Sequence, residues 1–376
     1  MTSLQLLRDA TRRCPKRMVY GPCGGVSGDG GCEVPGFRCS FAENPALLRE
    51  LEFSAADVQA PESARESSDA LATSPRRAAA AALGDLIGAG GVITADLPVR
   101  TTDPAVIVEA GARLRELTAV IAGEPPGLRE AFSPTHKALL LAEAGARVIA
   151  GVTCRDRNRV AIEGELAALA DLGVSGILAV TGDHPASTAL PDARPVFDLD
   201  STRVAALARR AGLFVAVAEQ PAAPPIAYRP TRLALKARAG AELGILNLCG
   251  DIEDIARFTA ALATTSAPVP VLVSIPVLTS PSAARRLASL PGVSLPPGIV
   301  TAAMGGGHGP DAGVRAAADW GRRALAIPGV VGVHLSAVVD EADASGLAAV
   351  DALAATAASI RDHRRADAAV TATEAC

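Results

Sequence analysis

The chain has 376 residues and lacks the features expected of a protein that acts at a membrane or on nucleic acid. No apolar run reaches the about 18 residues expected of a membrane-spanning helix. The start, MTSLQLLRDATRRCPKR, is basic but has no hydrophobic signal core. The 36 basic and 40 acidic residues are intermixed and leave a net charge of −4, so no basic patch for nucleic acid is indicated. We therefore expect a cytoplasmic protein that binds a small molecule, with neither a nucleic-acid nor a membrane partner.

A dinucleotide-binding fingerprint is also missing, and this bears on the fold. No GxGxxG follows an apolar run, and GGGHG at 305–309 lacks that spacing. Eight apolar segments instead read as strands, at 92–97, 118–123, 147–153, 176–181, 213–218, 244–249, 269–275 and 330–336. Most are continuous Val, Ile, Leu and Ala runs, which are typical of strands buried on both faces of a parallel sheet. Eight such strands separated by Ala-rich amphipathic stretches predict an α/β fold of the (β/α)8 TIM-barrel type, with an open doubly wound sheet as the alternative.

The composition divides the chain into four parts. Residues 55–84 are rich in Ala, Ser, Pro and charge and are predicted to be a linker. The linker separates a small module at 1–54 from the barrel at 85–365. Residues 366–376 have little to bury and are expected to form a frayed tail.

Four of the seven cysteines lie close together in the small module. These are Cys14, Cys23, Cys32 and Cys39, with eight, eight and six residues between them. In a chain expected in the cytosol, such cysteines indicate metal ligands or free thiols rather than disulfides. Four thiolates suit a tetrahedral zinc site or an iron–sulfur cluster, although the CxxC pairs common in both are absent. The alternative is a flexible arm with thiols that bind nothing.

The stretch from 148 to 185 carries the strongest indication of a binding site. It reads as strand, polar loop, helix, strand and polar loop, and both loops follow the carboxyl end of a strand. Ligands of parallel α/β folds bind beyond these ends. Further along, loops at 275–281 and 334–338 offer Thr279, Ser280, His334 and Ser336 as polar groups without an assigned role.

Several short sequence motifs resemble those of one protein family. TCRDRN and LAVTGDHP are similar to the third and fourth strand ends of methylenetetrahydrofolate reductases. CPKR, GPCGG and CEV resemble the cysteine-rich module called the C-terminal domain of that family, which here precedes the barrel. The resemblance implies that the chain is an oxidoreductase whose substrate is a folate, 5,10-methylenetetrahydrofolate, which it reduces to the 5-methyl form. NADH or NADPH would supply the electrons, through FAD or by direct hydride transfer. The alternative is a non-catalytic or electron-transferring partner subunit that binds another protein through its cysteine-rich module.

The resemblance also implies roles for five residues. Asp96, in ADLPVR, stands where the family has a glutamate that protonates N10 of the folate; the alternative for Asp96 is a helix N-cap. Asp183 would face the pterin ring and the electron carrier. Glu219, at the end of the fifth strand, and Asn247, at the sixth, align with folate-binding positions. Lys236 precedes an AGA turn, as does a family lysine that helps bind cofactor phosphate.

Four residues at the third and fourth strand ends are candidate cofactor contacts: Thr153, Arg155, Thr181 and Gly182. Arg155 and Arg157 have the geometry to hold a phosphate or a folate glutamyl tail bidentately. The alternative is that the RDR segment is a self-neutralising helix start capped by Asp156.

The sequence departs from flavin-bearing family members at two positions. Gly151 stands where many of them have histidine, and Thr181 where they have arginine. Aromatic residues make up only 3% of the chain, which leaves few rings to stack on a flavin or a pterin. These departures are compatible with hydride transfer directly from the nicotinamide to the folate.

Overall fold

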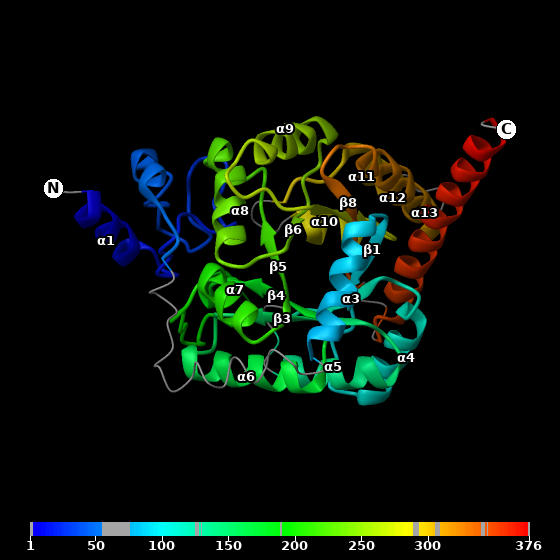
Figure 1. Ribbon diagram of the computed structural model, residues 1–376, viewed down its shortest axis with the longest axis horizontal. Coiled ribbons are helices and arrows are strands. Elements are labelled where there is room, and N and C mark those ends of the chain that lie inside the picture. The colour runs from blue at the N-terminus through cyan, green and yellow to red at the C-terminus, as the bar shows by residue number, and fades with distance from the viewer. Residues whose placement is uncertain are drawn as a thin grey trace.

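The computed structural model describes residues 3–54, 76–124, 128, 130–188, 190–288, 293–304, 309–339, 343 and 345–374. Eight parallel strands close into a barrel in the order β1 to β8, with β8 paired back to β1 (Figure 1). The strands are β1 (Val92–Asp96), β2 (Ala119–Ala122), β3 (Val148–Thr153), β4 (Gly176–Val180), β5 (Phe214–Glu219), β6 (Leu243–Leu246), β7 (Val271–Val277) and β8 (Val330–Ala337). The predicted barrel is therefore confirmed, and every predicted strand segment overlaps the observed one.

Helices cover the outside of the barrel (Figure 1). They are α4 (Pro104–Leu114), α5 (Pro134–Glu143), α6 (Arg159–Leu172), α7 (Ser201–Arg210), α8 (Arg229–Arg238), α9 (Ile252–Ala263), α10 (Pro281–Ala288), α11 (Pro297–Met304), α12 (Gly309–Leu325) and α13 (Leu347–Glu374), with short 3-10 turns η5 (Pro185–Ser187) and η6 (Ile226–Tyr228). Side chains that accept from the first free backbone N–H groups fix where several of them begin. Helix α13 continues to Glu374 and so includes most of the segment 366–376 that was expected to be a tail.

One helix closes the amino-terminal end of the barrel. Helix α3 (Arg76–Ala89) places Leu83 and Ile87 in a buried cluster with Val92, Phe214 and Leu243, which begin or flank the starts of β1, β5 and β6. The predicted linker at 55–84 thus includes the start of this helix, and its remainder, 55–75, lies outside the described residues. Because the amino-terminal opening is plugged, a ligand has access to the barrel at the carboxyl ends of the strands.

The module at 1–54 contains α1 (Ser3–Arg13), a 3-10 turn η1 (Pro45–Glu50) and two isolated antiparallel bridges, Val26 to Cys32 and Gly31 to Arg38. It lies beside α8 (Figure 1). Although its glycine-rich sequence has little apolar material, the module buries a small core: Ala10, Met18, Tyr20, Phe41, Leu47, Leu48 and Leu51, together with Leu235 of α8. Its core is therefore completed by the barrel.

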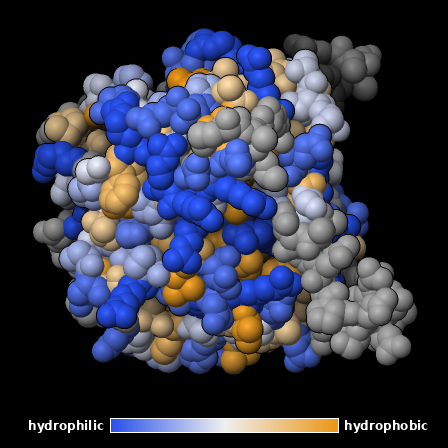
Figure 2. All heavy atoms as spheres, turned by 90° about the vertical axis from the view of Figure 1, so that its left-hand side faces the viewer, coloured by the Kyte–Doolittle hydropathy of each residue, from blue (hydrophilic) through white to orange (hydrophobic). Residues whose placement is uncertain are grey.

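The surface on the module's side of the molecule is mostly hydrophilic with scattered hydrophobic spots (Figure 2). Among the described residues, no helix combines the length and hydrophobicity of a membrane span.

Candidate active site at the carboxyl ends of the strands

The ends of β1 and β8 form the best-defined polar cluster of the barrel mouth. Asp96 ends β1, and the Ser336 hydroxyl of β8 donates to its Oδ2 at 2.6 Å. His334 Nε2 lies 3.2 Å from Asp96 Oδ1. The other ring nitrogen of His334, Nδ1, shares a 3.0 Å hydrogen bond with Thr94 Oγ1. His334 is buried while the Asp96 side chain is 36% exposed, so the pair holds one oriented carboxylate at the solvent side of the barrel.

The environment of Asp96 favours its charged form. Burial raises the pKa of this carboxyl, but the charge and hydrogen bond of His334 and the hydrogen bond from Ser336 outweigh it and hold the pKa below its ordinary value. The alternative that Asp96 caps the following helix is wrong, because Asp103 accepts from the Ala105 N–H and is the N-cap of α4. Asp96 is thus free of a capping role and is paired with His334 instead.

A second cluster joins the ends of β2 and β3 through a residue that the sequence did not single out. Glu124, which follows β2, accepts from both the N–H and the hydroxyl of Thr153 at 2.8 and 3.0 Å. Arg157 donates to the same carboxylate through NH1 at 2.8 Å and also through NH2. The ammonium of Lys137 donates to the Gly123 carbonyl nearby. The hydroxyl of Thr153 and the guanidinium of Arg157 are thus already bound within the protein.

The RDR segment, residues 155–157, was predicted either to bind an anion or to form a self-neutralising helix start capped by Asp156. Arg155 pairs with Asp156 at 2.6 Å, so these two charges neutralise each other. Asp156 is not the helix cap, because Asn158 accepts from Ala161 N–H and begins α6. In this arrangement neither Arg155 nor Arg157 has an unpaired guanidinium group with which to bind an anion.

The end of β4 brings a sharp turn against β3. Gly182 has φ of +88°, and a Cβ there would lie 3.2 Å from the Cβ atoms of Thr153 and Arg155, so the turn needs glycine. Thr181 is buried, and its hydroxyl donates to Ser201 Oγ and accepts from the Ser201 N–H at the start of α7, both at 3.3 Å. Asp183 is exposed. The turn therefore directs Thr181 into the protein and Asp183 to solvent.

The end of β5 is the most strongly charged buried part of the mouth. Glu219 is 4% exposed and accepts from Lys236 Nζ at 2.9 Å and from Arg229 NH1 at 3.3 Å, both on α8. Burial raises the pKa of Glu219, but Lys236, Arg229 and Arg232 together lower it to about 2. Burial lowers the pKa of Lys236 to about 8 despite the Glu219 carboxylate, with Arg232 and Arg229 adding to the effect. One carboxylate thus faces three cations, and Lys236 loses its proton more readily than an ordinary lysine.

The remaining predicted folate contact, Asn247, follows β6 next to this cluster. Its N–H donates to the Glu219 carbonyl at 2.8 Å, and its side chain is exposed. Asn247 and Asp183 therefore face solvent, whereas Glu219 and Lys236 face each other.

The cysteine-rich module contacts the mouth of the barrel at several points. Lys16 and Glu33 form a buried ion pair at 2.6 Å, and Glu33 Oε1 accepts from the His184 N–H at 2.6 Å. Arg229 NH1 donates to the Cys23 carbonyl at 3.0 Å. The N–H of Val19 donates to a carboxylate oxygen of Asp200, the N-cap of α7, at 3.4 Å. The ends of β4 and β5 are therefore bound to the module.

The four cysteines as placed do not fit a metal ion. They are free thiols, and no three metal-ligating side chains converge within the described part of the chain. Burial raises the pKa of Cys14 to about 12 and raises those of Cys32 and Cys39 as well. Metal ligands are thiolates, and the zinc or iron–sulfur site stays a prediction.

The residues at two family flavin positions also do not fit a flavin. A Cβ on Gly151 would lie 2.9 Å from the Gly123 Cα and 3.1 Å from the Ala122 carbonyl oxygen, so only glycine fits between β2 and β3. Thr181 is turned towards Ser201, as described above. The binding of FAD stays a prediction.

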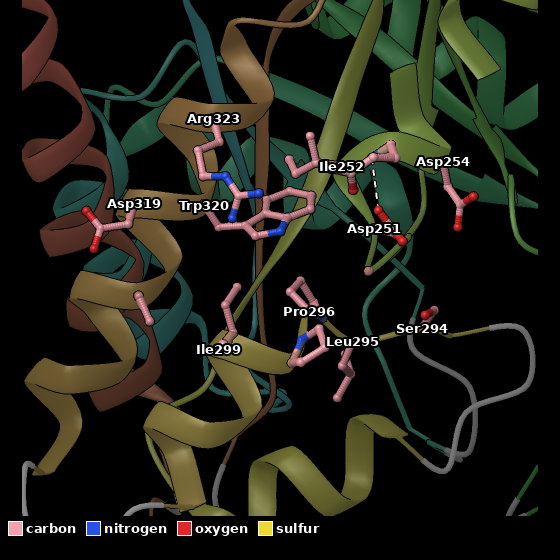
Figure 3. Close-up of a pocket in the computed structure, with 15 residues that line it drawn as sticks. Asp251, Ile252, Asp254, Ser294, Leu295, Pro296, Ile299, Asp319, Trp320 and Arg323 are labelled. Carbon is pink, nitrogen blue, oxygen red and sulfur yellow. Dashed lines mark hydrogen bonds between the residues drawn. The ribbon is translucent and has the colours of Figure 1, made fainter. Parts of the chain in front are cut away.

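A pocket of about 640 Å³ lies away from these residues, between the start of α9, the segment 294–299 and α12. Trp320 and Arg323 of α12 face Ile252 and Asp251 at the start of α9 (Figure 3). Its walls also carry the carboxylates of Glu253, Asp254 and Asp319. None of the predicted site residues lines it.

The fold and these clusters define a (β/α)8 barrel with an acid–histidine pair at its open end and a small module bound to its rim. Residues 118–345 match the family model described as methylenetetrahydrofolate reductase. Residues 9–62 match the model described as methylene-tetrahydrofolate reductase C terminal. Since the first match covers more than half of the chain, the protein belongs to the methylenetetrahydrofolate reductase family.

Solved structures share the barrel at low identity. An uncharacterized protein from Clostridium thermocellum that binds two copies of 5-methyl-5,6,7,8-tetrahydrofolic acid is 14% identical, with a TM-score of 0.51, over 70% of this chain and 94% of that one. Tryptophan synthase from M. tuberculosis is 15% identical, with a TM-score of 0.45, over 74% of this chain and 98% of that one. No curated protein sequence matches the chain significantly. The similarity to the Clostridium thermocellum protein shows the fold alone.

Proposed function

We propose that the protein reduces 5,10-methylenetetrahydrofolate to 5-methyltetrahydrofolate with a hydride from NADH or NADPH. Family membership supports the folate and the reaction class. The observation that carries the proposal is the pairing of Asp96 with His334 and Ser336 at the open end of the barrel. A barrel of this family needs an acid at that end, and this is the position where the sequence resemblance puts one.

The Asp96–His334 pair supplies the proton in this proposal. Because His334 and Ser336 hold the pKa of Asp96 below its ordinary value, the resting carboxyl is charged, and a proton has to reach it through its imidazole partner before it can act as the acid. Histidine is the side chain that takes up and releases protons near neutral pH. The proton passes from His334 Nε2 to Asp96 Oδ1 and on to N10 of the folate, which opens the five-membered ring and leaves an iminium at N5. Thr94 holds the other ring nitrogen and so fixes the orientation of the imidazole.

The hydride then adds to the iminium carbon, which becomes the methyl group, and the nicotinamide leaves oxidised. The proton and the hydride together balance the reaction. We propose direct transfer between the two bound substrates, because Gly151 and Thr181 do not fit the flavin contacts of the family. In this scheme the exposed side chains of Asp183 and Asn247 bind the pterin ring of the folate and the nicotinamide ring of the electron donor. Glu219 is buried and does not face the solvent. Its hydrogen bonds with Lys236 and Arg229 hold the carboxyl end of β5 in place.

The test is an anaerobic assay that follows oxidation of NADH or NADPH by the pure chain with and without 5,10-methylenetetrahydrofolate. Asp96→Asn removes the proton carrier but keeps the shape, so turnover should fall about 100-fold or more, while binding of 5-methyltetrahydrofolate stays within about twofold. Asp103→Asn is the matched control. Asparagine is an equally good N-cap for α4, so this variant should keep full activity.

Three results would contradict the proposal. Wild-type protein that oxidises neither nicotinamide with folate present would favour the partner-subunit alternative. Full turnover in Asp96→Asn would remove Asp96 from the mechanism. Visible flavin bands that NADH bleaches would replace direct transfer with a flavin route.

A further inference from the structure

A buried ion pair lies between the cysteine-rich module and the end of β4. Lys16 and Glu33 both belong to the module, and their side chains are 4% and 2% exposed. Glu33 Oε1 binds Lys16 Nζ and also accepts from the His184 N–H, both at 2.6 Å. The Ser187 hydroxyl approaches the same oxygen at 3.5 Å. One carboxylate oxygen of the module thus contacts the loop that follows Asp183.

Aromatic and electrostatic contacts fix the same loop from the other side. The imidazole of His184 stacks on Phe197, with ring centroids 5.7 Å apart and an interplanar angle of 19°. Lys16 Nζ lies 5.9 Å from the centre of the same Phe197 ring. Lys16 of the module and His184 of the loop therefore lie against the same aromatic ring.

Removing two charges from water costs free energy, so a buried ion pair at this position indicates a specific role. The module has another ion pair, Arg38 with Glu43 at 2.9 Å, but those side chains are 57% and 39% exposed and contact only the module. The buried pair, by contrast, joins the module to the barrel mouth. The Arg229 contacts with the Pro22 and Cys23 carbonyls join it to the β5 end in the same way.

We propose that Lys16 and Glu33 are positioning residues for the folate site, and that the module completes the barrel mouth by holding the Gly182–Ser187 loop and orienting Asp183. This inference rests on the proposed function for its effect on folate, but the structural contact to His184 is independent of it. The module is accordingly part of the active site of its own chain, and its contact with the barrel does not require a second protein.

The experiment compares two double variants of the full-length chain that differ in a single group. Lys16→Met with Glu33→Ala removes both charges and the acceptor for the His184 N–H. Lys16→Met with Glu33→Gln also removes both charges but keeps an acceptor oxygen. Removing both partners avoids leaving one charge buried without its counterion. Arg38→Gln, in the exposed pair of the same module, is the control.

The first readout is hydrogen–deuterium exchange of peptides covering 182–188 in ligand-free protein. We expect exchange about tenfold faster in the Ala double variant, near-normal exchange in the Gln double variant and no change in Arg38→Gln. The second readout is steady-state kinetics. The KM for the folate should rise about tenfold in the Ala double variant with a smaller change in kcat, because misplacement of a binding group by about 1 Å costs up to about 100-fold.

The outcomes separate this inference from the proposed function. Exchange and KM that are equal in wild type and both double variants would overturn the inference, even if wild type is active. Equal disturbance in the Ala and Gln variants would show that the acceptor for His184 has no positioning role. Inactive wild type with the expected exchange pattern would overturn the proposed function and leave the docking contact supported. If neither double variant folds, Glu33→Asp alone decides, because it keeps the charge but its shorter side chain withdraws the acceptor from the His184 N–H: wild-type exchange and KM in that variant would overturn the inference.

Discussion

Arg229 offers a sharp test of how the module and the barrel are held together. It is fully buried on α8 and is among the largest buried side chains of the described residues. Its guanidinium donates to Ala223 O at 2.7 Å, Pro224 O at 2.6 Å and Cys23 O at 3.0 Å, and it pairs with Glu219 at 3.3 Å. Arg229→Met would keep most of the side-chain volume while removing every one of these contacts.

The expected loss of stability follows from the groups that Arg229→Met leaves without a partner. Breaking a buried ion pair by removing one partner costs about 3–5 kcal/mol. Glu219 keeps Lys236 as a counterion, which puts the pair near the lower end of that range. Each carbonyl left without a donor adds about 1–3 kcal/mol, and such costs are not additive. We expect a loss of at least about 4 kcal/mol, a large part of the about 5–15 kcal/mol that stabilises a typical domain.

Urea unfolding monitored by circular dichroism measures this loss, and limited proteolysis reports whether the module detaches before the barrel unfolds. Arg113→Met is the matched control: Arg113 also pairs with two carboxylates, Glu109 and Asp351, but on the exposed outer surface. Exposed pairs contribute little, so the control should unfold at the wild-type urea concentration. If Arg229→Met unfolds within about 1 kcal/mol of wild type, the buried cluster does not join the module to the barrel.

Three further predictions follow from other parts of the structure. His334→Gln keeps a hydrogen-bond donor near Asp96 but cannot relay a proton, so turnover should fall about 100-fold in steady-state kinetics. Gly332→Ala should destabilise the barrel by several kcal/mol, because its Cβ would lie 2.2 Å from the Val92 carbonyl oxygen. Gly164→Ala, in open space on α6, should instead stabilise it by about 0.5–1 kcal/mol in the same denaturation assay. Since folding lowers the pKa of Glu219 from 4.5 to about 2, the stability it contributes above pH 4.5 should be lost as the pH falls towards 2, and a Glu219→Gln variant should lack this part of the acid dependence.

The barrel was predictable because its signal is local. Strands buried on both faces need unbroken apolar runs, and all eight runs stand out from the Ala-rich helices between them. The plug at the amino-terminal end was not predictable, because α3 begins in a stretch whose high Ala content resembles that of the linker before it. Only the contacts of Leu83 and Ile87 with the strand starts show what this helix does.

The site was predictable where a motif marked it and not where the contact joins distant segments. Asp96, Asp183 and Asn247 do lie at strand ends, as expected. Glu124 had no motif, and its role depends on Arg157 and Thr153 one strand away. Lys236 was expected to bind a cofactor phosphate, yet its ammonium lies buried beside Glu219.

The distribution of charge around the mouth limits how a ligand can bind there. The cations at the mouth that were candidates for binding phosphate or carboxylate are paired within the protein: Arg155 with Asp156, Arg157 with Glu124 and Lys236 with Glu219. The exposed polar groups are instead two acids, Asp96 and Asp183, and the amide of Asn247. Such groups accept hydrogen bonds from N–H donors, which a pterin ring has and a phosphate does not. The mouth is therefore suited to the ring of the folate, and an anionic part of either substrate has to bind at the rim or open one of the three pairs.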